Sequence, residues 1–309
     1  MVVQFSIILP VFNAKKTLPH IMDGLLSQSF RDFELLAVDD GSTDGSGQIL
    51  EQFAAQDNRI RVLHKENGGA NSARNLALQY VQGEYVVFCD ADDWVEEDWL
   101  QNFADNLLDN DVVVQGWTYV TETERLPQYY EEVPKTPAEA ADLMSQHESF
   151  GFLWNKCFRA GIIANNELRF DERFRFLEDE EFICRYWTHV QKVAFSPTVS
   201  YHYLMPDFNK KYNGVDNFQL YISLLDNASK FISYPFSVTM QKYTMGLFRN
   251  MMLAFQRHQC REAWHRLKIL VDYGKKFKCY NRYMQIITPR NYLLWYPILF
   301  VYCSIRSIL

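Results

Sequence analysis

Short apolar runs that alternate with longer amphipathic stretches constrain the fold of this chain more than any other feature. Five such runs, rich in β-branched residues, occupy 5–11, 33–40, 59–64, 84–90 and 111–117, and stretches with helical spacing lie near 14–28, 46–56, 71–82 and 95–109. Strands that alternate with amphipathic helices are typical of βα units around a mainly parallel sheet. The sequence therefore predicts an α/β fold built on a mainly parallel sheet.

Polar residues follow three of these apolar runs, at the points where the predicted strands end. The runs lead into PVFN (10–13), DDGS (39–42) and CDADD (89–93). Because ligands of such sheets bind at the carboxyl ends of the strands, these residues are expected along one rim. Asp90, Asp92 and Asp93 carry like charges within four positions, which is unfavourable unless a cation or hydrogen-bond donors lie among them. The pattern predicts a site for a divalent cation.

Charge is distributed unevenly along the 309 residues. Residues 242–309 hold twelve Lys and Arg against two acidic residues, a net charge of +10, which leaves −17 on the rest of the chain. From about 215 the periodicity is helical. The uncharged segment 292–305 is shorter than a membrane-spanning helix and contains Pro297, so attachment to the membrane surface is expected. A terminal helix that packs on its own domain is the alternative.

Cysteine and histidine usage bears on the compartment and on zinc. The six cysteines are scattered without paired spacing, and the N-terminus lacks the basic leader and the cleavage site of a signal peptide, so a reduced, cytoplasmic setting is expected. The seven histidines form no zinc-ligand pattern and are expected in packing or surface positions, with His202, between two tyrosines, as the one most open to another role.

Five segments in a fixed order resemble a known family. They are SIILPVFNAKKTLPHIMDGLLSQSFRDFELLAVDDGSTDGS (6–46), ENGGANSARNLAL (66–78), EYVVFCDADDWVEEDWL (84–100), LWNKCFRAGII (153–163) and FLEDEEFICRY (176–186). Together they resemble the bacterial, non-processive family 2 glycosyltransferases. The resemblance implies a GT-A (nucleotide-diphospho-sugar transferase) catalytic domain over 1–214, with a nucleotide half to about 117 and an acceptor half after it. Residues 215–309 would form a basic helical extension.

The resemblance also implies residues on the nucleotide-sugar side. These are Pro10, Phe12, Asn13, Asp39, Arg74, Asp90, Ala91 and Asp92, with Asp92 as ligand of Mn²⁺ or Mg²⁺. Asp39 is expected to accept the imide N–H of uracil, and Phe12 to stack on the base. Three alternatives stay open: turn chemistry alone for Asp39 and Asp40, a helix N-terminus for Asp93, and a solvent-exposed position for Arg74.

The same resemblance makes Asp179 the catalytic base. A group transfer to a hydroxyl needs a base near the acceptor and charge stabilisation on the departing diphosphate. Asp179 lies in an acidic run at the start of a predicted helix, and its neighbour Glu180 is the alternative base. Asn155, Lys156 and Glu178 are expected on the acceptor or phosphate side, although a solvated lysine is nearly as good an interpretation of Lys156.

These features favour one function over several others. The expected reaction is inverting transfer of a single sugar from a UDP-sugar to a glycan or lipid-linked oligosaccharide, during surface polysaccharide or lipopolysaccharide synthesis. The enzyme would lie on the cytoplasmic face of the membrane, with no nucleic acid partner. A catalytically silent glycan-binding or nucleotide-binding partner is the alternative. Dinucleotide-binding, Walker, nucleotidyltransferase and Q-x-x-R-W signatures of other classes are missing from the sequence.

Overall fold

The chain is described by a computed structural model that covers residues 3–205, 216–233, 237–257 and 259–277. It divides into two compact units. The first comprises residues 1–140 and 151–209, and the second comprises 141–150 and 210–309. The sequence placed a boundary at 214 without assigning 141–150 to the C-terminal part. The uncharged segment 292–305, for which attachment to the membrane surface was expected, lies outside the described residues.

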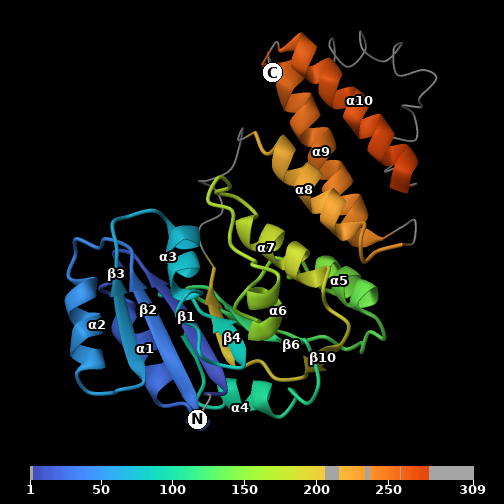
Figure 1. Ribbon diagram of the computed structural model, residues 1–309. Helices are drawn as coiled ribbons and strands as arrows, with labels where there is room; N and C mark the ends of the chain where they lie inside the picture. The colour runs from blue at the N-terminus through green and yellow to red at the C-terminus, as the bar shows by residue number, and fades with distance from the viewer. Residues whose placement is uncertain (1–2, 206–215, 234–236, 258, 278–309) are drawn as a thin grey trace. The chain divides into compact units, whose positions relative to one another are not determined.

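A seven-stranded sheet forms the framework of the first unit (Figure 1). Its strands are β1 (Phe5–Val11), β2 (Phe33–Asp39), β3 (Ile60–His64), β4 (Tyr85–Phe88), β6 (Val112–Gln115), β9 (Lys156–Arg159) and β10 (Val193–Ser196). They lie in the order β10-β6-β9-β4-β1-β2-β3, and only β9 runs antiparallel to its neighbours. The predicted mainly parallel sheet is confirmed, whereas β9 was not predicted.

Helices cover the sheet of the first unit. They are α1 (Leu18–Leu26), α2 (Ser46–Ala54), α3 (Ala70–Ala77), α4 (Trp99–Ala104), α6 (Ala160–Asn165) and α7 (Glu178–Trp187). In α1 the apolar spacing i, i+3, i+4, i+7 places Leu18, Ile21, Met22 and Leu25 in the core. β1 is apolar on both faces, as a strand covered on both sides requires, and burying each such side chain contributes about 1.5–3 kcal/mol.

A second, four-stranded sheet lies beside the end of β4. It consists of β5 (Trp94–Val95), β11 (Tyr201–Leu204), β7 (Trp117–Val120) and β8 (Arg125–Gln128), in that order. The run predicted as one strand over 111–117 is divided at Gly116 between β6 and β7. A Cβ at Gly116 would collide with the backbone oxygens of Gln128 and Thr198, so the chain changes sheets at the residue that lacks a side chain.

The helix predicted over 95–109 is shorter than expected. Residues 94–95 pair with β11 as β5, and α4 begins only at Trp99. Asp93 therefore precedes a strand, and the interpretation of Asp93 as a helix N-terminus is wrong.

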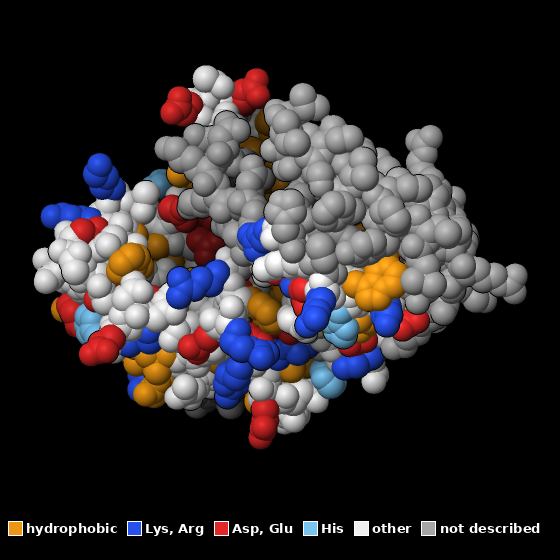
Figure 2. Space-filling view, turned by 90° about the horizontal axis from the view of Figure 1, so that it is seen from above, with side chains coloured by type: hydrophobic (Ala, Val, Ile, Leu, Met, Phe, Trp, Pro, Cys, Tyr) orange, Lys and Arg blue, Asp and Glu red, His pale blue; other side chains and the backbone are white. Residues whose placement is uncertain are grey.

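Side chains of both charges lie interspersed on the face of the molecule that Figure 2 presents.

The second unit is helical where it is described. It contains α8 (Phe218–Ala228), α9 (Val238–Gln256) and α10 (Cys260–Phe277), and α5 (Pro137–Gln146) crosses the boundary between the units. Asp142 caps the start of α9: its carboxylate accepts the backbone N–H groups of Val238 and Thr239 at 3.1 and 3.0 Å. None of the helices in the described ranges is long and apolar enough to cross a membrane.

Candidate active site

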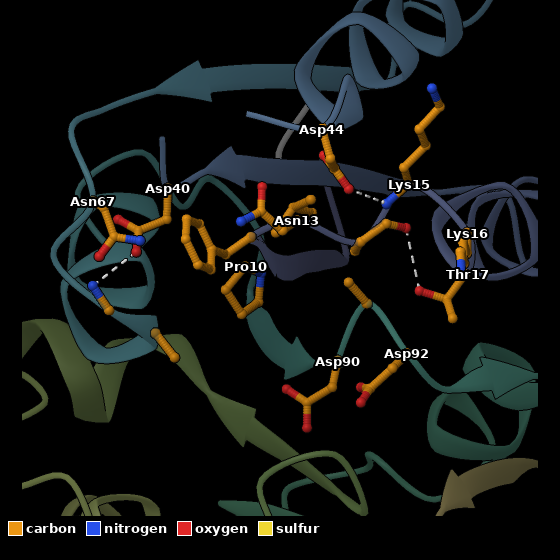
Figure 3. A pocket seen from close by; sticks show the side chains of 16 residues that line it. Pro10, Asn13, Lys15, Lys16, Thr17, Asp40, Asp44, Asn67, Asp90 and Asp92 are labelled. Atoms are coloured by element: carbon orange, nitrogen blue, oxygen red, sulfur yellow. Dashed lines mark hydrogen bonds between the residues drawn. The ribbon is translucent and has the colours of Figure 1, made fainter. Parts of the chain in front are cut away.

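The carboxyl ends of the parallel strands β1, β2 and β4 meet at one edge of the large sheet, and a cavity of about 980 Å³ lies over this edge. The cavity is lined by residues 10–17, Asp40, Asp44, Asn67, Gly69, Ala70 and 90–92 (Figure 3). Loops that are distant in sequence thus line one cavity because their strands end together. Six of the residues predicted on the nucleotide-sugar side line this cavity, and their contact with a nucleotide sugar stays a prediction: Pro10, Phe12, Asn13, Asp90, Ala91 and Asp92.

Hydrogen bonds between the loops after β1 and β2 make one wall of the cavity rigid. The backbone N–H groups of Asn13, Ala14 and Lys15 donate to side-chain oxygens of the 42–46 loop at 3.0, 2.9 and 2.9 Å. In return, the Oδ1 atom of Asn13 accepts the Thr43 N–H at 2.9 Å. Asn13 adopts a left-handed φ of 51°, which asparagine tolerates better than most residues. Phe12 keeps 51% of its surface exposed beside this wall.

Asp39 and Asp40 point to different surroundings. Asp39 accepts the Ser42 N–H at 3.0 Å and contacts Nδ1 of His64 at 3.1 Å, and it is not among the cavity-lining residues. Asp40 lines the cavity, where Oδ1 accepts from Lys65 Nζ and Gly68 N, and Oδ2 accepts from Gly69 N. An ionised carboxylate has about four acceptor positions, so Asp40 retains one. Asp40 therefore lines the cavity and the predicted Asp39 does not, and contact of either carboxylate with a nucleotide base stays a prediction.

Asp90 and Asp92 reach the cavity from the turn after β4 (Figure 3). Asp92 is exposed and Asp90 partly so. Among the described residues, no cluster of three or more His, Cys, Asp or Glu side chains is arranged to hold a metal ion. Two carboxylates in an open cavity nevertheless fit Mg²⁺ or Mn²⁺, since these ions use one or two protein carboxylates and take other oxygens from phosphates and water. The donor set suits an ion shared with a bound diphosphate.

Arg74 links this turn to Asp179, the predicted base. Arg74 is 5% exposed, and its Nη1 and Nη2 atoms donate to Asp179 Oδ1 at 2.7 Å and to Asp90 Oδ1 at 3.1 Å. The structure therefore does not support the open alternative of a solvent-exposed Arg74. It also gives Arg74 two carboxylate partners within the protein, whereas the sequence predicted a position on the nucleotide-sugar side.

The surroundings of Asp179 change its proton affinity. Asp179 is the second residue of α7, and the chain enters this helix through Leu177 with a φ of 53°. Desolvation by the surrounding protein raises the pKa of Asp179 to about 7; Arg74 and Lys156 oppose this effect, and the charges of Glu178 and Asp90 add to it. Since 31% of the side chain remains exposed, the carboxyl is still accessible to a reacting group. A carboxyl with this pKa suits proton transfer near neutral pH.

Two of the residues predicted on the acceptor side lie inside the protein. Lys156 and Asn155 are fully buried, and Lys156 Nζ donates to Phe152 O at 2.6 Å and to Asn155 Oδ1 at 2.9 Å. Neither residue lines the large cavity. Lys156 instead influences the site through its charge, which lowers the pKa of Asp179. Glu178 lines a smaller cavity of about 260 Å³ that shares Asn67, Gly69 and Ala70 with the first. Direct contact of these residues with an acceptor stays a prediction.

Among the cavity residues that were not predicted from the sequence, four carry charged or amide side chains: Lys15, Lys16, Asp44 and Asn67. A signal for them was present, since Lys15, Lys16 and Asp44 belong to the quoted segment 6–46 and Asn67 to 66–78. These residues lie on loops, where neither the spacing of apolar residues nor hydrophobicity indicates which side chains face a ligand.

Comparisons with known proteins agree with this geometry. The sequence model of the family described as "Glycosyl transferase family 2" matches residues 6–163, just over half of the chain. EpsJ of Bacillus subtilis, an uncharacterized glycosyltransferase, is 31% identical over 201 residues, which cover 62% of this chain and 58% of EpsJ. Glycosyltransferase GlyG of Streptococcus pneumoniae is 31% identical over 204 residues, covering 62% of this chain and 67% of GlyG. The chain thus spans less than two thirds of the length of EpsJ.

Solved structures share the fold at low sequence identity. Residues 1–349 of Staphylococcus aureus TarS in complex with UDP-GlcNAc superpose with a TM-score of 0.67 at 20% identity, covering 97% of this chain and 89% of that one. The mannosyltransferase PcManGT of Pyrobaculum calidifontis, in complex with GDP-Man and Mn²⁺, gives a TM-score of 0.58 at 16% identity, covering 97% and 88%. At these identities the likeness establishes the fold alone.

Proposed function

The chain belongs to glycosyltransferase family 2, and we propose that it transfers one sugar from a UDP-sugar to a bacterial surface glycan, with inversion at the anomeric carbon. The predicted GT-A fold is confirmed by the match to TarS and PcManGT. The observation that carries the proposal is the cavity that joins Phe12 and Asp40 to Asp90 and Asp92, with Asp179 bonded to Arg74 beside it.

Asp40 supports uracil as the base of the donor. Its three hydrogen bonds leave one acceptor position, and uracil presents one imide N–H at its edge. Guanine would present an N–H and an amino group side by side, which require two acceptors. The exposed ring of Phe12 offers a surface on which the base stacks. A TarS structure with UDP-GlcNAc supports the same nucleotide, although PcManGT was crystallised with GDP-Man.

Asp179 would act as the general base in a single displacement. The acceptor hydroxyl oxygen attacks the anomeric carbon, its proton moves to Asp179, and the bond from that carbon to the diphosphate oxygen breaks as UDP departs. An α-linked donor then gives a β-linked product. When bound, a divalent ion held by Asp92 and Asp90 would neutralise charge on the diphosphate. Arg74 orients the Asp179 carboxylate through the bond at 2.7 Å.

Two similar proteins bear on the acceptor class. TarS is described as a poly(ribitol-phosphate) β-N-acetylglucosaminyltransferase, and a similar protein of Borreliella burgdorferi as a cholesterol galactosyltransferase. The first acceptor is a surface polymer and the second is a lipid, so a glycan assembled at the cytoplasmic face of the membrane is our proposal for this chain. The net charge of +10 on 242–309 supports attachment to anionic lipid.

Release of UDP from a panel of UDP-sugars and GDP-sugars, measured with Mn²⁺, tests the proposal. We expect turnover of a UDP-sugar, whereas a silent binding partner would bind UDP and release none. Asp40→Asn replaces one acceptor oxygen by a donor and should weaken UDP binding by roughly tenfold, or about 1.4 kcal/mol. The matched control Asp39→Asn changes a carboxylate outside the cavity and should leave UDP affinity nearly unchanged. If Asp39→Asn lost more UDP affinity than Asp40→Asn, Asp39 would again be the residue assigned to the uracil N–H, as the sequence predicted.

A further inference from the structure

The turn that carries Asp90 and Asp92 is held at both of its ends. Before the turn, the Cys89 N–H donates to Ile8 O in β1 at 3.1 Å. After the turn, β5 pairs with β11 in an antiparallel arrangement that places Val95 opposite Tyr201. Within the turn, the Asp93 N–H donates to Asp90 O at 3.2 Å. The turn therefore connects the large sheet to the small one.

The Tyr201 hydroxyl binds the turn at two points. It accepts the backbone N–H of Asp90 at 3.1 Å and donates to Asp93 Oδ2 at 2.7 Å. The other oxygen, Asp93 Oδ1, accepts the Leu204 N–H at 2.8 Å. We call these three hydrogen bonds the Tyr201–Asp93 brace. Tyr201 and Leu204 both belong to β11, so this strand holds Asp90, where the turn begins, and Asp93, which follows the cavity-lining residues.

The tyrosine ring itself has little freedom to move. Tyr201 is fully buried and stacks on Trp154 with ring centroids 4.7 Å apart and planes 6° apart, and it also contacts Trp99 at 5.9 Å. Its hydroxyl is thus fixed relative to the two sheets. An immobile hydroxyl on the backbone N–H of Asp90 limits rotation of the peptide that precedes the cavity-lining carboxylates.

The stability of the fold does not by itself explain why an aspartate occupies position 93. Its side chain is 1% exposed and lies beside the like charges of Asp90 and Asp92. Burying a carboxylate costs free energy even when it accepts hydrogen bonds, and an apolar residue of similar size is often as stable. The brace provides a reason for its presence, since Asp93 Oδ2 accepts the Tyr201 hydroxyl proton and so leaves an oxygen lone pair of that hydroxyl facing Asp90 N.

We propose that Tyr201 and Asp93 are positioning residues, which hold the 90–92 turn in the conformation that receives a divalent ion and the donor diphosphate, without touching either. The proposal rests on the proposed function, because that function supplies the diphosphate. It assigns to Asp93 a role separate from that of Asp92, although the two carboxylates are adjacent in sequence.

Tyr201→Phe is the sharpest test, because it removes only the hydroxyl that joins Asp90 N to Asp93. Tyr186→Phe is a matched control: Tyr186 is also fully buried in the first unit, and its hydroxyl donates to Asp111 O at 2.6 Å and accepts Arg159 N at 2.8 Å. Tyr201→Phe loses two hydrogen bonds, and Tyr186→Phe loses the two just given and a longer one to Arg159 O at 3.4 Å, so both variants should unfold at a lower temperature. Only Tyr201→Phe should weaken binding of Mn²⁺ in the presence of UDP, by roughly tenfold.

Electron paramagnetic resonance of free Mn²⁺ measures this affinity without requiring turnover. With Tyr201→Phe we also expect the Mn²⁺ concentration for half-maximal UDP release to rise, while kcat at saturating Mn²⁺ stays close to that of the wild type. Asp93→Asn keeps the shape of the side chain but presents an amide to Tyr201 or Leu204, so it should also weaken Mn²⁺ binding. This variant replaces Tyr201→Phe as the test if Tyr201→Phe does not fold.

Equal Mn²⁺ affinity in Tyr201→Phe and the wild type would overturn the brace and leave the proposed function intact. Equal losses in Tyr201→Phe and Tyr186→Phe would also overturn it, because the effect would then follow from stability alone. Wild-type protein that binds no Mn²⁺ with UDP, and releases no UDP from any UDP-sugar, would refute the proposed function together with the brace.

Discussion

Replacing Arg74 by methionine should move the pH dependence of transfer, because Arg74 is the cation nearest to the proposed base. Its charge opposes the desolvation that raises the pKa of Asp179 to about 7, through a contact of 2.7 Å. Unit charges about 4 Å apart interact by roughly 4 kcal/mol at an effective dielectric constant of about 20. Solvent at the partly exposed Asp179 screens much of this, so we expect the pKa to rise by about one unit, or about 1.4 kcal/mol.

The assay is the pH profile of kcat/KM for UDP release. A general base acts in its deprotonated form, so activity should increase with pH through a midpoint at the pKa of the free enzyme. At pH 7 the wild-type base would be about half ionised and the Arg74→Met base about one tenth ionised, which predicts a roughly fivefold lower rate that recovers above about pH 9. Arg185→Met is the control: it removes the ion pair with Glu181 at 2.8 Å on the same helix and should leave the midpoint unchanged.

A rate lowered by the same factor at every pH, together with an increased KM for the UDP-sugar, would refute this reasoning. That result would mean that Arg74 contacts the donor directly, as the sequence predicted, rather than acting on Asp179. An unchanged profile in Arg74→Met would refute Asp179 as the group responsible for the midpoint.

Three further predictions concern single side chains. Asp179→Asn should reduce transfer by at least about 100-fold and leave UDP affinity by calorimetry nearly unchanged; loss of UDP binding would place Asp179 on the donor side and favour Glu180. Asp92→Asn should abolish Mn²⁺-dependent UDP release with little change in unfolding temperature, an expectation that wild-type activity in excess EDTA would contradict. Hydrogen bonds to Glu51 and Asp39 raise the pKa of His64 in the folded protein. The protonated ring therefore stabilises the folded state fully below about pH 6.5, and this contribution is lost as the pH rises through the raised pKa. His64→Gln should therefore lower the unfolding temperature at about pH 6 but not at about pH 9, and equal losses at both would show that the charge is not involved.

The sequence alone determined the strands that position the site. The predicted runs 5–11, 33–40 and 84–90 correspond to β1, β2 and β4 within one or two residues. Their apolar, β-branched composition identifies them because a strand covered on both faces has little other choice of residue. Since parallel strands end at a common edge, residues that follow all three strands, such as Asn13, Asp40 and Asp90, line one cavity, as expected for a common rim.

Only the tertiary structure decided which side chains at that edge meet. Asp39 and Asp40 are equivalent by sequence pattern, but the position of His64 and of the 66–69 loop turns one away from the cavity and the other into it. Contacts that join residues about a hundred positions apart, such as Arg74 to Asp179 and Tyr201 to Asp90, leave no local signal. Periodicity and propensity describe neighbours along the chain, whereas these contacts depend on how separate sheets and helices pack, which brings their side chains within hydrogen-bonding distance.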